Sequence, residues 1–197
     1  MTDAVLAGTW VVDLRRRTSF SRGHLPGTVS MEYGTQFATY VGWLVPWEDE
    51  LVLLCDDPED LGSALRDLAA IGMDGPRTHL LDVATPLPAT YRRADWAAFR
   101  DEVAQAPVAP VVVDVRQRDE HDQEHLPGSL NLPVQDVDLR GADLPPGELW
   151  VHCRSGYRAG IAASILHRMG RRVVHVDDAW ERVAELAIPT TTGGVAA

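Results

Sequence analysis

The sequence predicts an α/β protein made of two small domains in tandem, each with a mostly parallel sheet and helices on both faces. Three observations support this fold class. The chain of 197 residues is long enough for two domains of roughly 100 residues each. Its hydrophobic content of 45% allows a packed core in both. A set of short motifs occurs twice in the same order, and strand-like segments alternate with helix-like segments.

A repeat of short motifs divides the chain into two halves. Residues 11–27 read VVDLRRRTSFSRGHLPG, and residues 112–128 read VVDVRQRDEHDQEHLPG. Further along, Cys55 of the first half matches Cys153 of the second, and each cysteine is followed by a helix-like segment and a glycine. One such match could arise by chance, but an ordered series indicates an internal repeat.

The repeat sets the expected domain boundaries. The first domain is assigned to residues 1–86 and the second to residues 87–197. Between the repeats, Ala84–Arg93 contains two prolines and little apolar periodicity, which is typical of a linker. The tail Thr190–Ala197 is small and polar, so it is expected to fray.

Periodicity locates the elements of each domain. Short β-branched or apolar runs predict parallel strands, and amphipathic segments between them predict the helices that cover the sheet. In the first domain, strands are expected at Thr9–Leu14, Leu51–Cys55 and Thr78–Asp82, and a helix at Glu59–Ile71. In the second, strands are expected at Pro110–Val115, Glu148–Cys153 and Arg172–Val176, and helices at Tyr157–Met169 and Ala179–Ala187.

Composition excludes several classes of partner. The formal net charge is -11, which argues against nucleic acid as a general partner, because phosphate binding needs a basic face. Apolar runs such as Val108–Val113 are too short to span a membrane. Met1–Leu6 has neither a basic region nor a long apolar one, so no secretory signal is predicted and a cytoplasmic location is expected. In that setting Cys55 and Cys153 are expected to be free thiols.

The segment from Cys153 to Arg158 reads CRSGYR and falls between a predicted strand and a predicted helix. Ligands of open parallel sheets bind at the carboxyl ends of the strands. A loop there can turn its N–H groups inward, Gly156 permits the backbone angles, and the following helix adds the positive end of its dipole. Together with Arg154 and Arg158, these groups favour the thiolate of Cys153, which predicts a depressed pKa and a nucleophile.

In this order and spacing, DVR at Asp114–Arg116, HLPG at His125–Gly128 and the CRSGYR loop resemble tandem rhodanese-like sulfurtransferases. The resemblance covers nearly the whole chain, because the first half resembles a degenerate second copy. More narrowly, WLVPW at Trp43–Trp47 resembles the rhodanese tail of bacterial fusion proteins whose other half is a metallo-β-lactamase-fold hydrolase. No HxHxDH metal motif of such a hydrolase occurs in this chain.

The length of the loop separates this resemblance from its nearest rival. Cysteine phosphatases of related fold place five residues between Cys and Arg, whereas four residues separate Cys153 from Arg158. The smaller ring suits a single sulfur atom bound to the cysteine rather than a tetrahedral phosphate. We therefore expect sulfur transfer in preference to phosphatase or arsenate reductase activity.

The resemblance implies a thiosulfate sulfurtransferase that needs neither a cofactor nor a metal. The Cys153 thiolate would take a sulfur from thiosulfate or a persulfide and pass it to a thiol acceptor, or to cyanide in an assay. Backbone N–H groups of the loop would hold the persulfide. The two arginines would orient the sulfonate of the donor. The binding residues implied for this loop are Arg154, Ser155, Gly156, Tyr157 and Arg158.

The same resemblance implies supporting roles for residues outside the loop. Asp114 matches the aspartate at a strand end, which is expected to brace the loop rather than react. Arg118 is either a further donor-binding residue or a solvated surface arginine. Asp177–Asp178 stands where many members have a pair of glycines, which alters the rim that faces the acceptor.

A second function stays open at this point. The chain would then be a non-catalytic module that binds persulfide and partners or regulates a metallo-β-lactamase-fold sulfur-oxidising hydrolase. The sequence names neither the physiological donor nor the acceptor.

The matching loop of the first half has different chemistry. It reads CDDPED from Cys55 onward, and its acids would repel anionic donors and oppose ionisation of the thiol. Pro58 also removes a backbone donor. Asp57, Pro58 and the acids after them are typical of a helix start. Cys55 is therefore expected to be structural, and its domain to pack against the second and shape the entrance to the site.

Other conspicuous side chains are assigned structural roles. The HLPG histidines, His24 and His125, are expected to hydrogen-bond the backbone of the turn. His121 and His125 have the spacing of a metal-binding pair on a helix, but no further ligand accompanies them, so no metal site is predicted. Packing in the core or between the domains is expected for Tyr40, Trp43 and Trp47.

Overall fold

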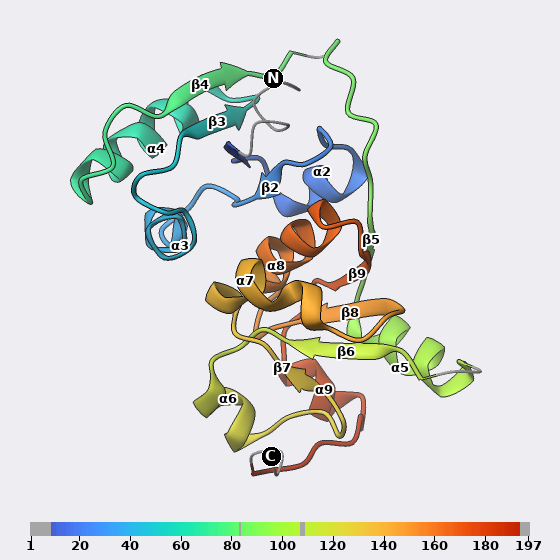
Figure 1. Cartoon of the computed structure of the whole chain (residues 1–197). Coiled ribbons are helices and arrows are strands. Elements are labelled where there is room, and N and C mark those ends of the chain that lie inside the picture. The colour runs from blue at the N-terminus through green and yellow to red at the C-terminus, as the bar shows by residue number, and fades with distance from the viewer. Residues whose placement is uncertain (1–8, 83, 107–108, 194–197) are drawn as a thin grey trace. The chain divides into compact units, whose positions relative to one another are not determined.

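Two compact units make up the structure, a computed structural model that describes residues 9–82, 84–106 and 109–193 (Figure 1). Unit 1 is Met1–Thr90 and unit 2 is Tyr91–Ala197. In both, strands alternate with helices and the paired strands are parallel. The predicted α/β class with parallel sheets is confirmed. Within the described ranges, no helix combines the length and apolar character needed to cross a bilayer.

Unit 1 has, among its described residues, a four-stranded sheet in the order β2-β1-β3-β4. Its strands are β1 (Trp10–Asp13), β2 (Val29–Ser30), β3 (Leu51–Cys55) and β4 (Arg77–Leu80). Its helices are α2 (Arg17–Arg22), α3 (Phe37–Leu44) and α4 (Pro58–Ala70). Every residue of β1 and β3 is buried, so the core of this unit surrounds the two central strands.

Unit 2 has a five-stranded sheet over its described residues, in the order β5-β9-β8-β6-β7. Its strands are β5 (Arg92–Ala94), β6 (Val111–Asp114), β7 (Leu130–Asn131), β8 (Glu148–His152) and β9 (Arg172–Val176). Its helices are α5 (Trp96–Gln105), α6 (Arg118–Gln123), α7 (Val137–Arg140), α8 (Tyr157–Arg168) and α9 (Glu181–Glu185), with short 3-10 turns at Val134–Asp136 and Gly141–Asp143.

The two units pair their central strands in the same register. In unit 1, Asp13 at the end of β1 lies opposite Ser30 on one side and Leu54 on the other. In unit 2, Asp114 at the end of β6 lies opposite Asn131 and His152 in the same way. The repeated sequence motifs therefore occupy equivalent positions in two sheets of matching strand order.

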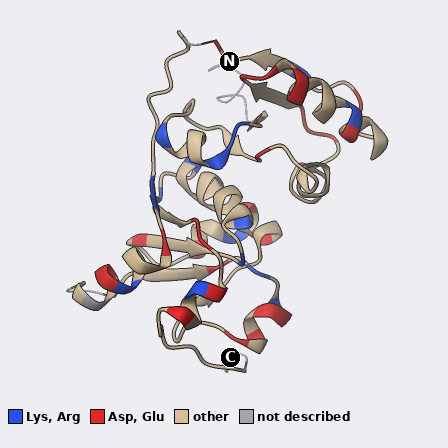
Figure 2. Ribbon diagram, turned by 180° about the vertical axis from the view of Figure 1, so that it is seen from behind, with Lys and Arg blue, Asp and Glu red and all other residues tan. Residues whose placement is uncertain are grey.

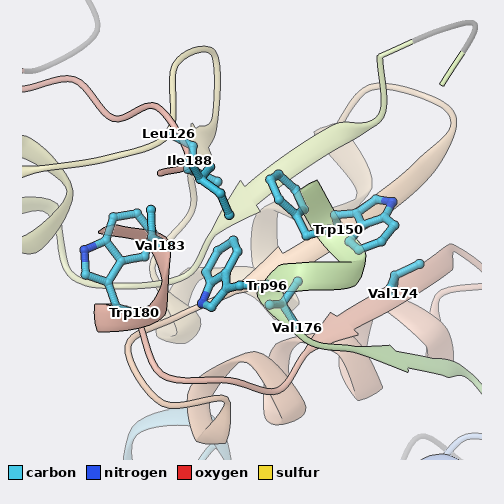
Figure 3. Packing of buried hydrophobic residues seen from close by; sticks show 9 residues of the cluster. Trp96, Leu126, Trp150, Val174, Val176, Trp180, Val183 and Ile188 are labelled. Atoms are coloured by element: carbon cyan, nitrogen blue, oxygen red, sulfur yellow. The ribbon is translucent and has the colours of Figure 1, made fainter. Parts of the chain in front are cut away.

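Aromatic side chains form much of the core of unit 2. Trp96, Phe99, Trp150 and Trp180 are buried in one cluster with aliphatic residues from α9 and β9, and Figure 3 shows Trp96 and Trp180 close together in it. The Trp96 ring meets the Trp180 ring edge-on, with centroids 5.6 Å apart. Because Trp180 directly precedes α9, this packing fixes the start of that helix on the sheet.

Two segments predicted to lie outside the domains contribute residues to unit 2. The end of the expected linker forms edge strand β5, which pairs with β9. In the expected tail, Thr191 pairs its backbone with His125, and the Gly193 N–H donates to the Asp122 carbonyl. The boundary between the units lies within the expected linker, so that prediction fails only for Arg92 and Arg93. The expected fraying of the tail was wrong for Thr191 and Gly193, because backbone pairing ordered a segment that buries little apolar surface of its own. Residues 194–197 of the tail lie outside the described residues.

The tryptophans of WLVPW are not core residues. Tyr40 is buried on α3, as expected, but Trp43 is 55% exposed and Trp47 is 61% exposed. Neither tryptophan therefore packs in the core of unit 1, and the buried face of α3 is made by Phe37, Tyr40, Val41 and Leu44. Packing between the domains, the other role expected for them, stays a prediction.

Candidate active site

Cys153 lies where strand β8 meets helix α8, the strand–loop–helix arrangement that the sequence predicts. The side chain is nearly inaccessible, because Cys153 is 1% exposed. Its Sγ accepts a weak hydrogen bond from the N–H of Ala159, 3.4 Å away in the first turn of α8. Gly156 has φ +84° and is the N-cap of α8, which confirms that the loop needs the left-handed backbone favoured by glycine. The sulfur thus lies at the positive end of a helix dipole.

Two hydrogen bonds from elements distant in sequence anchor this Cys153 loop. The Gly156 carbonyl lies 2.8 Å from Nε2 of buried His175 on β9, and since a carbonyl can only accept, Nε2 is the donor. The Trp180 N–H donates to the Arg154 carbonyl at 2.8 Å. Sequence reasoning missed both anchors, and the only signal was a histidine within the apolar run of β9.

Asp177 lies directly against Gly156. A Cβ added at Gly156 would stand 2.2 Å from Oδ1 of Asp177 and 2.9 Å from its Cα. Asp177 forms an ion pair with Arg93 of β5 at 2.6 Å, and Asp178 accepts a hydrogen bond from the Trp96 N–H. Asp177 and Asp178 therefore tie the rim of the loop to β5 and α5.

Both arginines of the loop are paired with glutamates. Arg158 donates from its two terminal nitrogens to the two carboxylate oxygens of Glu120 on α6, at 2.5 and 2.9 Å. Arg154, which is exposed, pairs with Glu181 of α9 at 2.6 Å. Hydrogen bonding from Arg158 holds the pKa of Glu120 below its ordinary value, so Glu120 is ionised at neutral pH. The sequence identified the arginines but not these carboxylates, because the pairs join separate elements.

The remaining predicted site residues divide into two groups. Ser155 is exposed and Tyr157 is half-buried within the loop itself. Arg118 is exposed in the first turn of α6. It lines a hollow of about 460 Å³ together with residues such as His121, Ser129 and Arg140, and the described loop residues do not contribute to this lining. Residues 153–158 thus lie together in one loop, whereas Arg118 lines a hollow to which that loop does not contribute.

Asp114 has partners different from those expected. Its carboxylate accepts from the backbone N–H, Nε and Nη2 of Arg116 at 2.6–3.0 Å and lies 3.0 Å from Nδ1 of His121. Burial alone would raise the pKa of Asp114, but it is outweighed by the charge that His152 carries in acid, where Asp114 titrates, and by the hydrogen bonds and charge of Arg116. Together they hold the pKa of Asp114 well below its usual range. Asp114 thus braces the segment that leads into α6 through Arg116, and the described contacts do not include the Cys153 loop.

The same aspartate–arginine clip occurs in unit 1. Arg15 donates to Asp13 through its backbone N–H, Nε and Nη2, and its Nη2 also reaches the Gly23 carbonyl. In unit 2, Nη2 of Arg116 reaches the carbonyl of Glu124. Each clip therefore joins a strand end to the residue before an HLPG motif, which explains why this part of the repeat persists in both halves.

The HLPG histidines have structural hydrogen bonds. Nδ1 of His24 lies 2.9 Å from the Phe20 carbonyl, and Nδ1 of His125 lies 2.8 Å from the His121 carbonyl. The acceptors belong to the preceding helices, one turn earlier, rather than to the turn itself. The rings of His121 and His125 stack with centroids 3.9 Å apart, and Nδ1 of His121 is held by Asp114. Within the described part of the chain, no cluster of three metal-ligating side chains occurs.

His152, which immediately precedes Cys153, is a residue that sequence reasoning missed. It is fully buried and stacks on Trp180, and within the described structure neither ring nitrogen has a hydrogen-bond partner. Burial lowers the pKa of His152 to about 4, although Asp114, 3.9 Å away, favours the charged form. His152 is therefore neutral at neutral pH, and its contact with Asp114 is not an ion pair there.

We expect His152 to make unit 2 sensitive to acid. An unfolded histidine has a pKa of about 6.5, so between about pH 6.5 and pH 4 the unfolded chain binds a proton that the folded chain excludes. The free energy of unfolding should fall by up to about 3 kcal/mol across this window because of His152. In His152→Leu, which copies Leu54 at the equivalent place in unit 1, this loss should disappear.

Urea unfolding followed by tryptophan fluorescence at pH 7 and pH 5 tests this expectation. His79→Leu is the matched control, because His79 is exposed on β4 of unit 1. An equal acid sensitivity in wild type and His152→Leu would contradict the assignment.

The equivalent loop of unit 1 confirms the predicted helix start. Asp57 is the N-cap of α4, its carboxylate accepts from the Glu59 N–H at 2.8 Å, and Pro58 occupies the first turn. Cys55 is 1% exposed. Burial raises the pKa of the Cys55 thiol, and the charges of Asp56 and Asp60 raise it further. Loss of a proton from this thiol is thus disfavoured, as the acidic loop predicts.

Comparison with known proteins places this site in a family. Residues 96–186 match the family model of the rhodanese-like domain. The chain is 33% identical over 84 residues to thiosulfate sulfurtransferase PspE of Escherichia coli, and the match covers 41% of this chain and 78% of that protein. The chain belongs to the rhodanese-like family.

Two further similarities cover different parts of the chain. An HTH-type transcriptional regulator of Mycobacterium tuberculosis is 32% identical over 105 residues, which are 51% of this chain and 46% of that protein. The crystal structure of thiosulfate sulfurtransferase from Pseudomonas aeruginosa superposes with a TM-score of 0.46 at 19% identity, over 94% of this chain and 37% of that one. This chain therefore spans less than half of either protein.

Proposed function

We propose that the protein is a sulfurtransferase that carries sulfane sulfur on Cys153. The observation that carries the proposal is the position of Sγ, at the N-terminal end of α8 and 3.4 Å from the Ala159 N–H, in a loop shaped by Gly156. The N-terminal end of a helix is a common binding position for anions, and a persulfide carries its charge on sulfur. Membership in the rhodanese-like family and the similarity to a thiosulfate sulfurtransferase support the same activity.

The proposed reaction has two steps. The Cys153 thiolate attacks the outer sulfur of the donor, a new S–S bond forms at Sγ, and the bond inside the donor breaks. Thiosulfate leaves as sulfite, and a thiol persulfide leaves as its thiolate, each with the electron pair of the broken bond. An acceptor thiolate, or cyanide, then attacks the outer sulfur of the Cys153 persulfide and restores the Cys153 thiolate.

We further propose that the two units are tandem rhodanese-like domains of which only unit 2 is active. The matching strand order, register and aspartate–arginine clips support this assignment. In unit 1, an acidic helix start replaces the arginine-containing loop. The small sulfur donor and the thiol acceptor would therefore bind only in unit 2.

Sulfur loading tests the proposed function. Protein incubated with thiosulfate or a thiol persulfide should gain one sulfur atom on the peptide that contains Cys153, as measured by mass spectrometry. Cyanide should then remove this sulfur as thiocyanate. Loading without release to cyanide or thiols would instead support the persulfide-binding module, which would act beside a metallo-β-lactamase-fold hydrolase. Absence of loading from either donor would refute both.

Replacement of Cys55 by alanine should leave turnover within about twofold of wild type, because burial and the adjacent acids disfavour its thiolate. Thiocyanate release under saturating thiosulfate and cyanide measures this. A large loss in a variant that still unfolds at the wild-type urea concentration would show that unit 1 takes part in the transfer.

A further inference from the structure

The charges around the Cys153 loop are balanced by carboxylates. Arg158 and Arg154 are paired with Glu120 and Glu181, and on the rim Arg93 is paired with Asp177. Figure 2 shows acidic residues among the arginines of unit 2. Each of these three arginines therefore has a negative charge within hydrogen-bonding distance, which reduces the attraction that it can exert on an anion.

Of the two loop pairs, Arg158–Glu120 should have the larger effect on how strongly the site attracts an anion. Its geometry is bidentate, so the carboxylate occupies the fork that would otherwise recognise a sulfonate. The side chains of Arg158 and Glu120 are only 15% and 26% exposed, so solvent screens them less than the exposed Arg154–Glu181 pair. Arg158 also directly precedes Ala159, whose N–H contacts Sγ of Cys153.

We propose that Glu120, assisted by Glu181, sets the donor specificity of the Cys153 site, against dianionic thiosulfate and in favour of persulfides of organic thiols. This inference rests on the proposed sulfur transfer and adds the class of donor. Thiosulfate brings a sulfonate that needs positive partners, and here those partners are already neutralised. A persulfide of a neutral thiol carries its charge only on the sulfur, which the N-terminal end of α8 can accommodate.

Glutamine at position 120 provides the direct test. Glu120→Gln keeps an acceptor for the Gln117 N–H, which Glu120 contacts at 3.0 Å, but removes the charge opposite Arg158. The kcat/KM for thiosulfate should rise roughly tenfold, whereas that for the persulfide of 2-mercaptoethanol should change less than about twofold. Glu181→Gln should raise the thiosulfate value by less than about threefold, because this pair is exposed.

Two controls separate specificity from other effects. In Glu120→Gln/Arg158→Gln the gain on thiosulfate should vanish, since it depends on the released guanidinium. Glu48→Gln, an exposed residue of unit 1, changes the net charge equally and should leave both donors unaffected.

Three outcomes would overturn the proposal. A fall in thiosulfate kcat/KM in Glu120→Gln would show that Glu120 orients Arg158 for the donor, and equal gains with both donors would show a general effect on Cys153. No change with either donor would exclude any role in specificity. Failure of the proposed function is seen separately, as wild-type Cys153 that gains no sulfur from either donor.

Discussion

Alanine in place of Cys153 should reduce thiocyanate formation by at least about 10³-fold, because the nucleophile and the carrier of the sulfur are the same atom. Cys55 cannot substitute for it, since that thiol is buried beside acids that raise its pKa. Cys153→Ser keeps nearly the same volume at a position that is 1% exposed, so it separates chemistry from packing. Both variants should lose sulfur loading.

Two measurements test this prediction, namely sulfur loading at position 153 and the stability of the Cys153→Ser variant. Mass spectrometry should find no additional sulfur on the peptide that contains position 153, while urea unfolding should show the Cys153→Ser variant folded. Transfer at the wild-type rate in either variant would refute the mechanism.

Gly156→Ala should disrupt the Cys153 loop and lower transfer by about 100-fold or more, because correct placement of reacting groups accounts for large factors in rate. Two effects would destabilise the loop in this variant. The backbone at Gly156 has φ +84°, and the new Cβ would lie 2.2 Å from Oδ1 of Asp177. Left-handed strain and the clash together should lower the free energy of unfolding by about 3–4 kcal/mol.

Gly170 provides a matched control for the backbone strain alone. It has φ +80° at the end of α8, and a Cβ there would meet no atom within 4 Å. Gly170→Ala should therefore cost only about 1 kcal/mol and leave transfer nearly unchanged. Urea unfolding and thiocyanate assays on the two variants test the difference. Equal losses of stability, with transfer intact in both, would show that the contact with Asp177 does not shape the loop.

Elements with a strong local pattern were predictable from the sequence. The apolar run of β3 and the β-branched run of β9 were located at their observed ends, and the helix start at Asp57 was recognised from capping chemistry. Residues 153–158 could be proposed as a site because cysteine, glycine and arginine between a strand and a helix form a local signal, and the structure places them between β8 and the first turn of α8. The α/β class followed from the same alternation.

Interactions between distant segments were not predictable. Glu120 and Arg158 meet only because the fold brings together residues 38 positions apart in the sequence, and the anchor from His175 requires the pairing of β9 with β8. The sequence did not point to His152 as a buried titratable residue, since one histidine in an apolar strand forms no recognisable pattern. The strand at Arg92–Ala94 is short, polar and preceded by prolines, so its identity depends on the partner strand rather than on local propensity.

Strand β5 also determines where unit 2 can be cut. A fragment beginning at Trp96, where the family match starts, would lack the residues that pair with Val174, His175 and Val176. It would leave a valine-rich strand with unsatisfied backbone donors and acceptors, the kind of edge on which further chains can assemble. It would also remove the arginine that neutralises Asp177 beside the cysteine loop. We therefore expect that an excised unit has to begin upstream of Arg92 to keep β9 paired and to retain the Arg93–Asp177 contact beside the loop.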